Sequence, residues 1–156
     1  MVGSDADRRL KELGVVLPSP PIPLGAYVEA TRCGSLLFLS GMLPVDRDDP
    51  KYSGRLGEEL SIQDGYDAAR SASLGGLAAA QEFLGSLNQI RSIAKLGVYI
   101  ATPAGFREHP KVADGASELL LDVFGAGKVP PRIVLGVASI PLGLPVEIEL
   151  IFEIEP

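Results

Sequence analysis

The chain has 156 residues, 46% of them hydrophobic and 22% charged, which is the composition of one ordinary globular domain. Its net charge of −6 disfavours nucleic acid as a partner, and its single cysteine, Cys33, cannot form an internal disulfide. No apolar run approaches the roughly 18 residues of a membrane span and the N-terminus carries no apolar signal core, so a cytoplasmic location without a membrane partner is expected.

Residues 1–26 are predicted to form an arm on the surface of a single domain that spans residues 27–156. A short helix is expected near the start of this arm, capped by Asp5 or Asp7 and ended by Gly14. The segment LPSPPIPLG that follows is too rich in proline for regular secondary structure.

A hairpin and a charged loop are predicted next. The stretch YVEATRCGSLLFLSG at 27–41 holds two β-type runs around a Cys-Gly-Ser turn signal, which is typical of a hairpin. The stretch DRDDPKYSGRLGEE at 46–59 combines charged residues with glycine and proline, and we expect it to be a mobile loop.

Two helices are predicted further along the chain. Ser61 and Asp64 resemble an N-cap pair that begins the first helix. Gly75-Gly76 within it lowers helix propensity by about 1 kcal/mol per glycine, which favours close packing of this helix against a sheet. The second helix starts near Pro110 and ends at Gly125, and its apolar residues recur at three- and four-residue steps: Val112, Ala113, Ala116, Leu119, Leu120, Val123 and Phe124.

Two strands with period-two alternation are predicted beside these helices. The strand at 90–101 should bury Ile90, Ala94, Leu96, Val98 and Ile100. The last strand, VEIELIFEIE, should bury Val146, Ile148, Leu150, Phe152 and Ile154. Its other face then carries Glu147, Glu149, Glu153 and Glu155, a pattern also typical of a solvated sheet face.

The strand VPPRIVLGVASIP at 129–141 carries one arginine at its start. Alternation groups Arg132 with Val134, Gly136 and Ala138, opposite Ile133, Leu135 and Val137. The larger apolar set is expected to meet the helices, so Arg132 is expected on the helix-free face. There its planar guanidinium can bind a carboxylate through two parallel hydrogen bonds, and an ordinary ion pair at the sheet end is the alternative.

The element order β-β-α-β-α-β-β predicts an α+β fold, with a mixed sheet, two helices on one face and one right-handed βαβ crossover. If the last two strands fold about Gly143, Glu147 lies opposite position 139, about seven residues or roughly 23 Å from Arg132. A pocket that uses both residues must then combine two subunits.

Other chemistries lack the residues they need. His109 is the only histidine and Cys33 the only cysteine, so zinc and iron–sulfur centres are excluded. No G-x-S-x-G context supports a catalytic triad with His109, and no glycine-rich phosphate loop is present. From the residues we therefore expect no metal centre and no cradle for a nucleotide phosphate.

Five segments in collinear order resemble the YjgF/RidA family, also called endoribonuclease L-PSP: GAYVEA (25–30), LLFLSGMLP (36–44), KLGVYIAT (95–102), PPRIVLGVASIP (130–141) and PVEIELI (145–151). The resemblance implies a chorismate-mutase-like fold assembled as a homotrimer with pockets between subunits. It also implies hydrolysis of reactive enamines and imines, such as 2-aminoacrylate, to ammonia and 2-keto acids without a metal or an organic cofactor. The expected partner is therefore a small molecule that bears a carboxylate.

The same resemblance implies roles for individual residues. Arg132 is similar to the arginine that clamps the substrate carboxylate, and Glu147 to the acid that positions or activates water. Tyr27 and Ser40 match the pocket tyrosine and the serine that precedes a glycine. An imine carbon is already electrophilic, so orientation and one general acid or base suffice for its hydrolysis.

Two positions depart from the family pattern. Ser117 stands where active members often have asparagine, and Val134 stands where they often have cysteine and use the backbone N–H. These departures, with the long arm and the 46–59 loop, suggest a divergent branch. They leave open a second function, a trimer that binds small carboxylates without turnover. A third function, RNA cleavage or translation inhibition, is implied by the older family label and fits the negative net charge least.

Overall fold

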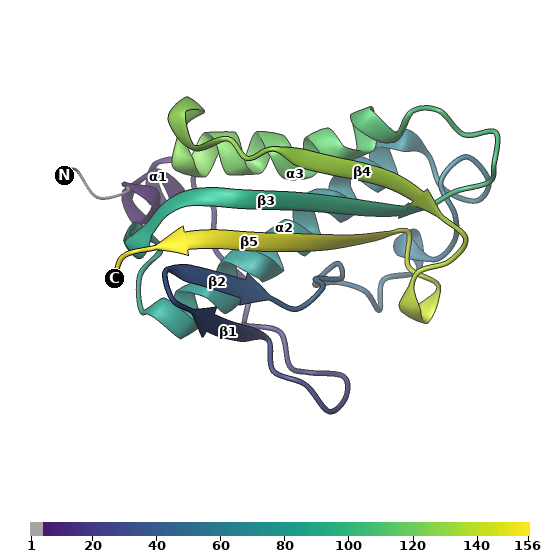
Figure 1. The fold of residues 1–156 in the computed structure, drawn as a ribbon. Coiled ribbons are helices and arrows are strands. Elements are labelled where there is room, and N and C mark those ends of the chain that lie inside the picture. Colours follow the sequence, from purple (N-terminus) through teal and green to yellow (C-terminus); the bar gives the residue numbers. More distant parts are fainter. Residues whose placement is uncertain (1–4) are drawn as a thin grey trace.

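Five strands form one mixed sheet in the order β1-β2-β5-β3-β4, in a computed structural model that describes residues 5–156 (Figure 1). Only β3 and β4 pair in parallel; the other neighbours are antiparallel. The strand bounds are β1 Ala30–Cys33, β2 Leu36–Leu39, β3 Ile90–Ala101, β4 Arg132–Val137 and β5 Val146–Ile154. The predicted hairpin, the crossover and the α+β class are confirmed.

Two long helices, α2 (Ile62–Leu84) and α3 (His109–Phe124), cover one face of the sheet (Figure 1). The helix α2 begins at the predicted capping box, in which the Ser61 hydroxyl accepts from the Asp64 N–H and the Asp64 carboxylate accepts from the Ser61 N–H. Chain reversal after α3 follows from Gly125, whose φ of 85° suits a residue without a Cβ.

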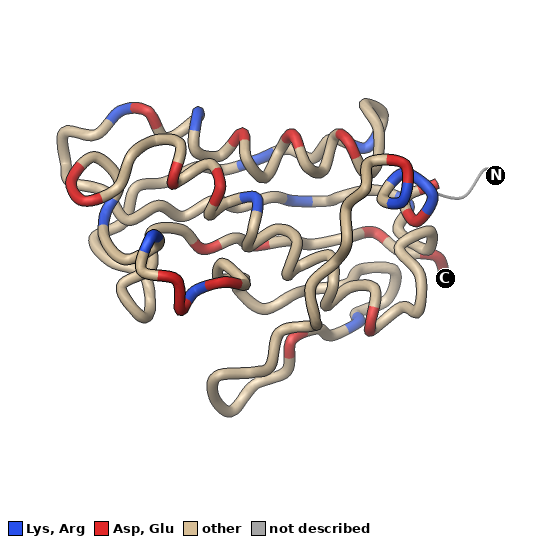
Figure 2. Tube along the Cα trace, turned by 180° about the vertical axis from the view of Figure 1, so that it is seen from behind, with Lys and Arg blue, Asp and Glu red and all other residues tan. Residues whose placement is uncertain are grey.

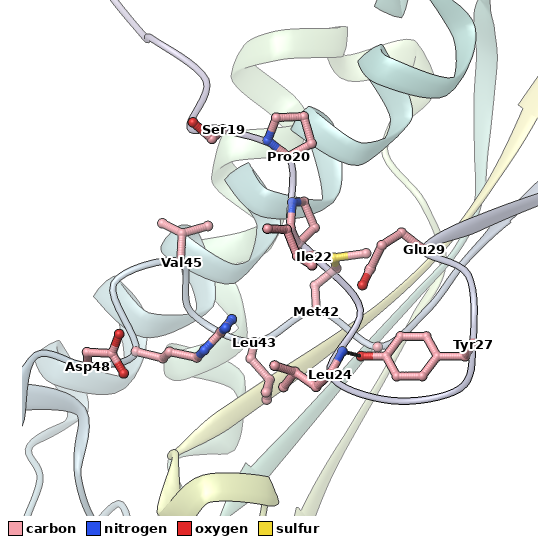
Figure 3. Close-up of a pocket in the computed structure, with 13 residues that line it drawn as sticks. Ser19, Pro20, Ile22, Leu24, Tyr27, Glu29, Met42, Leu43, Val45 and Asp48 are labelled. Carbon is pink, nitrogen blue, oxygen red and sulfur yellow. Dashed lines mark hydrogen bonds between the residues drawn. The ribbon is translucent and has the colours of Figure 1, made fainter.

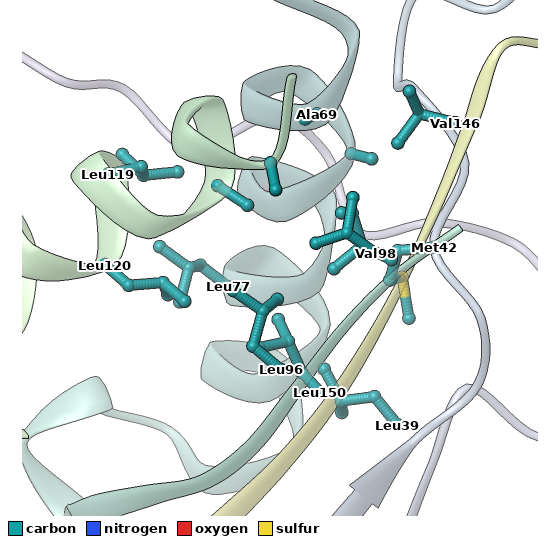
Figure 4. Close-up of a cluster of buried hydrophobic side chains, with 14 of the residues drawn as sticks. Leu39, Met42, Ala69, Leu77, Leu96, Val98, Leu119, Leu120, Val146 and Leu150 are labelled. Atoms are coloured by element: carbon teal, nitrogen blue, oxygen red, sulfur yellow. The ribbon is translucent and has the colours of Figure 1, made fainter. Parts of the chain in front are cut away.

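The core lies between the sheet and these two helices (Figure 4). The predicted inner residues of β5 and the predicted apolar stripe of α3 are all buried. Gly76 lets α2 approach the sheet, because a Cβ there would lie 2.9 Å from the Leu150 Cδ1 atom. Close packing at the Gly75-Gly76 pair is therefore confirmed.

A glycine also sets the distance between α2 and α3. A Cβ on Gly115 would lie 2.1 Å from the backbone oxygen of Tyr66, which cannot move without shifting α2. Although alanine is the better helix former, we expect Gly115→Ala to lower the free energy of unfolding by about 1–3 kcal/mol through overpacking. Urea unfolding measures this loss, and Gly105→Ala, where a Cβ would meet nothing within 4 Å, is the control. Equal stability of both variants would contradict the prediction.

The arm begins with α1 (Ala6–Glu12), which packs against the body through one face. Ala6 and Leu10 are buried in the core. The Asp7 carboxylate accepts hydrogen bonds from the Ser86 hydroxyl at 2.5 Å and the Leu87 N–H at 3.2 Å. The helix thus lies on the surface of the body with one apolar face buried, while residues 1–4 lie outside the described residues.

The rest of the arm has no regular secondary structure, as predicted. It runs across the helix side of the molecule and ends in a loop that projects beyond β1 (Figure 2). In the same view, the positions of lysine and arginine are interspersed with those of aspartate and glutamate along the trace. No helix within those residues is both long and apolar enough to cross a membrane.

The 46–59 segment was predicted to be a mobile loop, yet it contributes to the core. Tyr52 and Leu56 are buried, and the Leu56 N–H donates to the Ala101 oxygen at 2.9 Å. The Arg55 guanidinium donates to the Thr102 carbonyl oxygen. Two apolar side chains among many charges thus fix this segment against the end of β3.

In β3 the predicted alternation is broken near its start. The pairing of β3 with β5 shifts between Ile90 and Ser92 and again between Ile93 and Lys95. These irregularities turn Ile93 inward and leave Ala94 exposed, so the prediction that Ala94 is buried was wrong.

Candidate functional site

Arg132 faces the helices, not the helix-free side of the sheet. It pairs with Leu96 of β3, whose side chain is fully buried beneath the helices. Its Nη1 atom donates to the Asp114 Oδ1 atom at 2.8 Å and to the Ser117 Oγ atom at 3.0 Å. Both acceptors lie on α3, so the predicted face of Arg132 was wrong.

The crowding at the other end of β4 explains this orientation. A Cβ on Gly136 would lie 2.5 Å from the His109 Nε2 atom and 2.6 Å from the Thr102 Oγ1 atom. The small residues of β4 therefore face α3, with Val134 packed against the core. Ile133 and Leu135, predicted to meet the helices, are 42% and 45% exposed on the free face.

The contacts of Arg132 hold one corner of its guanidinium. Asp114 and Ser117 both bind Nη1, which leaves the Nε–Nη2 edge outside these two contacts. This edge has the paired donors that match a carboxylate. The side chain of Arg132 is 30% exposed, so a small anion can reach it. The structure thus brings Ser117 and Arg132 together, with Val134 two residues along the strand.

Glu147, Tyr27 and Ser40 meet in a different place, a cleft of about 390 Å³ at the end of β2. It is lined by Leu24, Gly25, Tyr27, Ser40, Gly41, Leu43, Pro141 and Glu147. The Glu147 carboxylate lies directly over Gly41, where a Cβ would come within 2.2 Å of the Oε1 atom. The glycine of the LSG motif therefore makes room for the glutamate.

Tyr27 and Ser40 are both held by backbone groups of the chain just before β1. The Tyr27 hydroxyl accepts from the Leu24 N–H at 2.9 Å, and the Ser40 hydroxyl donates to the Val28 oxygen at 2.6 Å. These bonds fold the segment between Leu24 and Val28 into one wall of the cleft. The ring of Tyr27 is placed by this wall rather than by a strand.

Two carboxylates on the free face of β5 have different surroundings. Burial raises the pKa of Glu147 above its ordinary value. Glu149, two residues along, accepts from the Tyr99 hydroxyl at 2.6 Å and lies 3.4 Å from the Lys95 Nζ atom. Glu147 is thus poised to carry a proton, whereas Glu149 is occupied by its contacts with the Tyr99 hydroxyl and the Lys95 ammonium.

Tyr99 and Lys95 were missed as site residues by the sequence reasoning, which named only the residues of this strand that it expected to be buried. Tyr99 pairs directly with Glu147 across β3 and β5, and it shares a shallow cleft on the free face with both glutamates. A signal was present, since outward polar residues on neighbouring strands lie side by side. Finding them required the order of strands.

Within one chain, the two groups of candidate residues lie on opposite faces of the sheet. The register puts Glu147 level with Leu135, three residues along β4 from Arg132 and two strands away, or about 14 Å between Cα atoms. The expected 23 Å was too large, because β4 and β5 are not a simple hairpin. The sheet itself separates the guanidinium from the carboxylate.

Residues 5–156 contain no group of three or more His, Cys, Asp and Glu side chains arranged to hold a metal ion. Cys33 is a free thiol at the exposed hairpin turn, away from both candidate groups. The chemistry that the arrangement supports is recognition of a carboxylate by Arg132 and proton transfer by Glu147.

Comparison with known proteins gives a consistent family assignment. Residues 7–154 match the model of the family described as YjgF/chorismate mutase-like, putative endoribonuclease. Protein TCP17 of Trypanosoma cruzi is 35% identical over 93% of this chain and 91% of its own. The crystal structure of a putative endoribonuclease from Shewanella oneidensis MR-1 superposes with a TM-score of 0.89, at 32% identity over 96% of this chain and 99% of that one. A 2-iminobutanoate/2-iminopropanoate deaminase of Dermatophagoides farinae is 26% identical over 88% of this chain and 93% of its own.

Proposed function

The chain belongs to the YjgF/chorismate mutase-like family, and from this premise we propose that it hydrolyses reactive imines and enamines to 2-keto acids in pockets between the subunits of a homotrimer. One observation carries the proposal: a carboxylate-binding guanidinium and a shielded carboxyl are both present, but on opposite faces of one sheet. A relative with the name of an imine deaminase supports the reaction class.

Exposed apolar side chains support the assembly. The free face of the sheet carries Phe38, Ile133 and Leu135, each more than one-third exposed. Ile22 and Val28, in the loop that projects beyond β1, are 78% and 65% exposed. Apolar surface of this extent on a sheet face marks an interface. A neighbouring copy that covers this surface would bring its own Arg132 to the cleft that holds Glu147.

The proposed reaction adds water to the C=N bond and releases ammonia. Arg132 of one subunit holds the substrate carboxylate, which fixes C2 of the imine beside Glu147 of the next subunit. Glu147 takes a proton from water as the water oxygen bonds to C2 of the protonated imine and the C=N electron pair moves to nitrogen. The carboxyl returns this proton to the nitrogen, and ammonia leaves with the C2–N electron pair while the C2 hydroxyl gives its proton to Glu147 and becomes the keto oxygen. An enamine first needs a proton on C3, and the raised pKa of Glu147 favours the protonated carboxyl that donates it.

The direct test supplies imines in situ. An amino acid oxidase converts L-2-aminobutyrate to 2-iminobutanoate, and the release of ammonia is followed with and without the purified chain. We expect acceleration over buffer and, by light scattering after size exclusion, a mass three times that of the chain. A monomer, or a rate equal to that in buffer, would refute the proposal.

A second candidate function is binding of small carboxylates without turnover. Asp114 already pairs with Arg132 and competes with a substrate carboxylate for it, and Ser117 offers a shorter side chain than the asparagine common in the family. Calorimetric titration with 2-oxobutanoate separates the two functions. Tight binding by a trimer that releases no ammonia would favour the binding protein.

A further inference from the structure

A second cleft, of about 230 Å³, adjoins the one that holds Glu147 (Figure 3). Residues of the 19–29 segment form one wall of it, and residues of the 41–48 segment, which leaves β2, form the opposite wall. We call it the arm cleft. Polar and apolar groups both line it, and its charged residues are Glu29, Arg47 and Asp48. A few placed charges beside apolar walls are typical of sites for small molecules.

Glu29 and Arg47 approach the arm cleft from opposite sides. In Figure 3, Glu29 lies on the same side of the cleft as Tyr27. Val45 and Asp48, which bracket Arg47 in the chain, lie on the other side. Burial raises the pKa of the Glu29 carboxyl, and the positive charge of Arg47 opposes that rise. The two charges therefore act on each other across the cleft.

Both of these charges are half-buried and lack a direct partner. Within residues 5–156, neither the Glu29 carboxylate nor the Arg47 guanidinium forms a hydrogen bond or an ion pair. Asp48 is exposed, and it too has no ion-pair partner in this part of the chain. Taking a charge partly out of water without a partner is unfavourable. A ligand that carries both a positive and a negative group offsets this cost on both sides of the cleft.

We propose that the arm cleft binds a small zwitterion, and that free α-amino acids are the class of ligand. The ammonium of the amino acid pairs with the Glu29 carboxylate, and its carboxylate pairs with the Arg47 guanidinium. Pro20, Pro21 and Val45 supply apolar surface beside these charges. The site goes beyond the proposed imine hydrolysis, because neither of the two reactive side chains of that proposal lines the arm cleft.

The wall made by the arm is already in place, although it has no regular secondary structure. Prolines at positions 18, 20, 21 and 23 fix φ through this stretch. The Tyr27 hydroxyl accepts from the Leu24 N–H, drawn as the dashed line in Figure 3, and so closes the loop at its end. A ligand that enters the cleft does not have to order this wall, which lowers the entropic cost of binding.

The test compares three molecules of similar shape and different charge. L-valine carries both groups, 3-methylbutanoate lacks the ammonium, and 2-methylpropylamine lacks the carboxylate. Calorimetric titration of the wild-type chain at neutral pH measures the affinity of each. Valine should bind at least about tenfold more tightly than either analogue, because each charge-assisted hydrogen bond contributes that much to affinity. Equal affinities, or no binding of valine, would overturn the proposal.

Two variants assign each charge to its partner. In Glu29→Gln, valine should lose its advantage over 3-methylbutanoate and keep its advantage over 2-methylpropylamine, and Arg47→Gln should show the reverse. Glu82→Gln and Arg107→Gln change exposed residues outside the cleft, so as matched controls they should keep both preferences. If both preferences persisted in Glu29→Gln and Arg47→Gln, valine would bind elsewhere and the assignment would be wrong.

Arg132→Ala separates this site from the proposed imine pocket. Arg132 does not line the arm cleft, so valine should bind this variant as it binds wild type, while 2-oxobutanoate binding is lost. Loss of valine binding would show that the amino acid occupies the arginine clamp, and it would overturn the separate site. Retained preference for valine in a chain that hydrolyses no imine would refute the proposed reaction but support the zwitterion site.

Discussion

Replacing Arg132 with alanine is expected to lower kcat/KM for 2-iminobutanoate by about 10²–10⁴-fold. The guanidinium is proposed to donate two charge-assisted hydrogen bonds to the substrate carboxylate, and each is worth about 1.5–3 kcal/mol. The fold should survive, because the existing Arg132–Asp114 ion pair joins partly exposed side chains and such pairs contribute about 0–1 kcal/mol. The same variant should lose measurable binding of 2-oxobutanoate.

The control for this change is Arg8→Ala, which likewise removes an arginine from ion pairs between exposed side chains, here with Asp5 and Glu12. It should leave both kinetics and 2-oxobutanoate binding unchanged. Arg132→Lys keeps the charge but not the planar fork, so it should recover only part of the activity. Full activity in Arg132→Ala would show that the arginine has no part in the mechanism. There would then be no reason to propose a pocket that combines Arg132 of one subunit with Glu147 of its neighbour.

Local patterns predicted most of the fold because their signals lie close together in the sequence. Three such signals depend only on residues a few positions apart: the Ser61–Asp64 capping box, the apolar stripe of α3 and the strict alternation of β5. Packing did not override these signals. The 46–59 segment was mispredicted because two buried side chains, Tyr52 and Leu56, outweigh its charged composition.

The faces of β4 could not be predicted for a different physical reason. Alternation correctly separated Arg132, Val134 and Gly136 from Ile133 and Leu135, but it does not say which set meets the helices. Gly136 sits under His109 and Thr102, which come from distant positions in the sequence. The larger residues Ile133 and Leu135 were left on the free face, where the proposed neighbouring subunit would bury them. An apolar face looks the same in sequence whether a helix or a second copy covers it.

Predicting the site from sequence met the same limit. Glu147 and Ser40 share a cleft because β2 and β5 are neighbours in the sheet, which the motifs alone did not say. The contrast between Glu147 and Glu149 also depends on strand order. Tyr99 and Lys95 contact Glu149 from β3. For Glu147, burial raises the pKa and no neighbouring positive charge in the described part of the chain offsets that rise. Two glutamates that look equivalent in VEIE are therefore suited to different tasks.

Glu147→Gln is expected to lower kcat by about 10²–10⁴-fold while binding of 2-oxobutanoate persists, because glutamine keeps the shape of the side chain but cannot exchange a proton. This outcome is the converse of the one for Arg132→Ala, which should abolish binding. Glu153→Gln, on the same face of β5 but outside the lining of the Glu147 cleft, is the matched control and should keep wild-type kinetics.

The pH dependence of stability separates a catalytic from a structural role of Glu147. Burial raises the pKa of this carboxyl, so the folded chain disfavours its charge. The stability that the carboxyl contributes is complete below its unfolded pKa and is lost as pH rises through the folded value. Glutamine carries no charge at any pH, so Glu147→Gln should have a Tm equal to or above that of wild type at neutral pH, and the difference should shrink in acid. A lower Tm at neutral pH, with activity lost in proportion, would show that Glu147 supports the fold rather than the reaction.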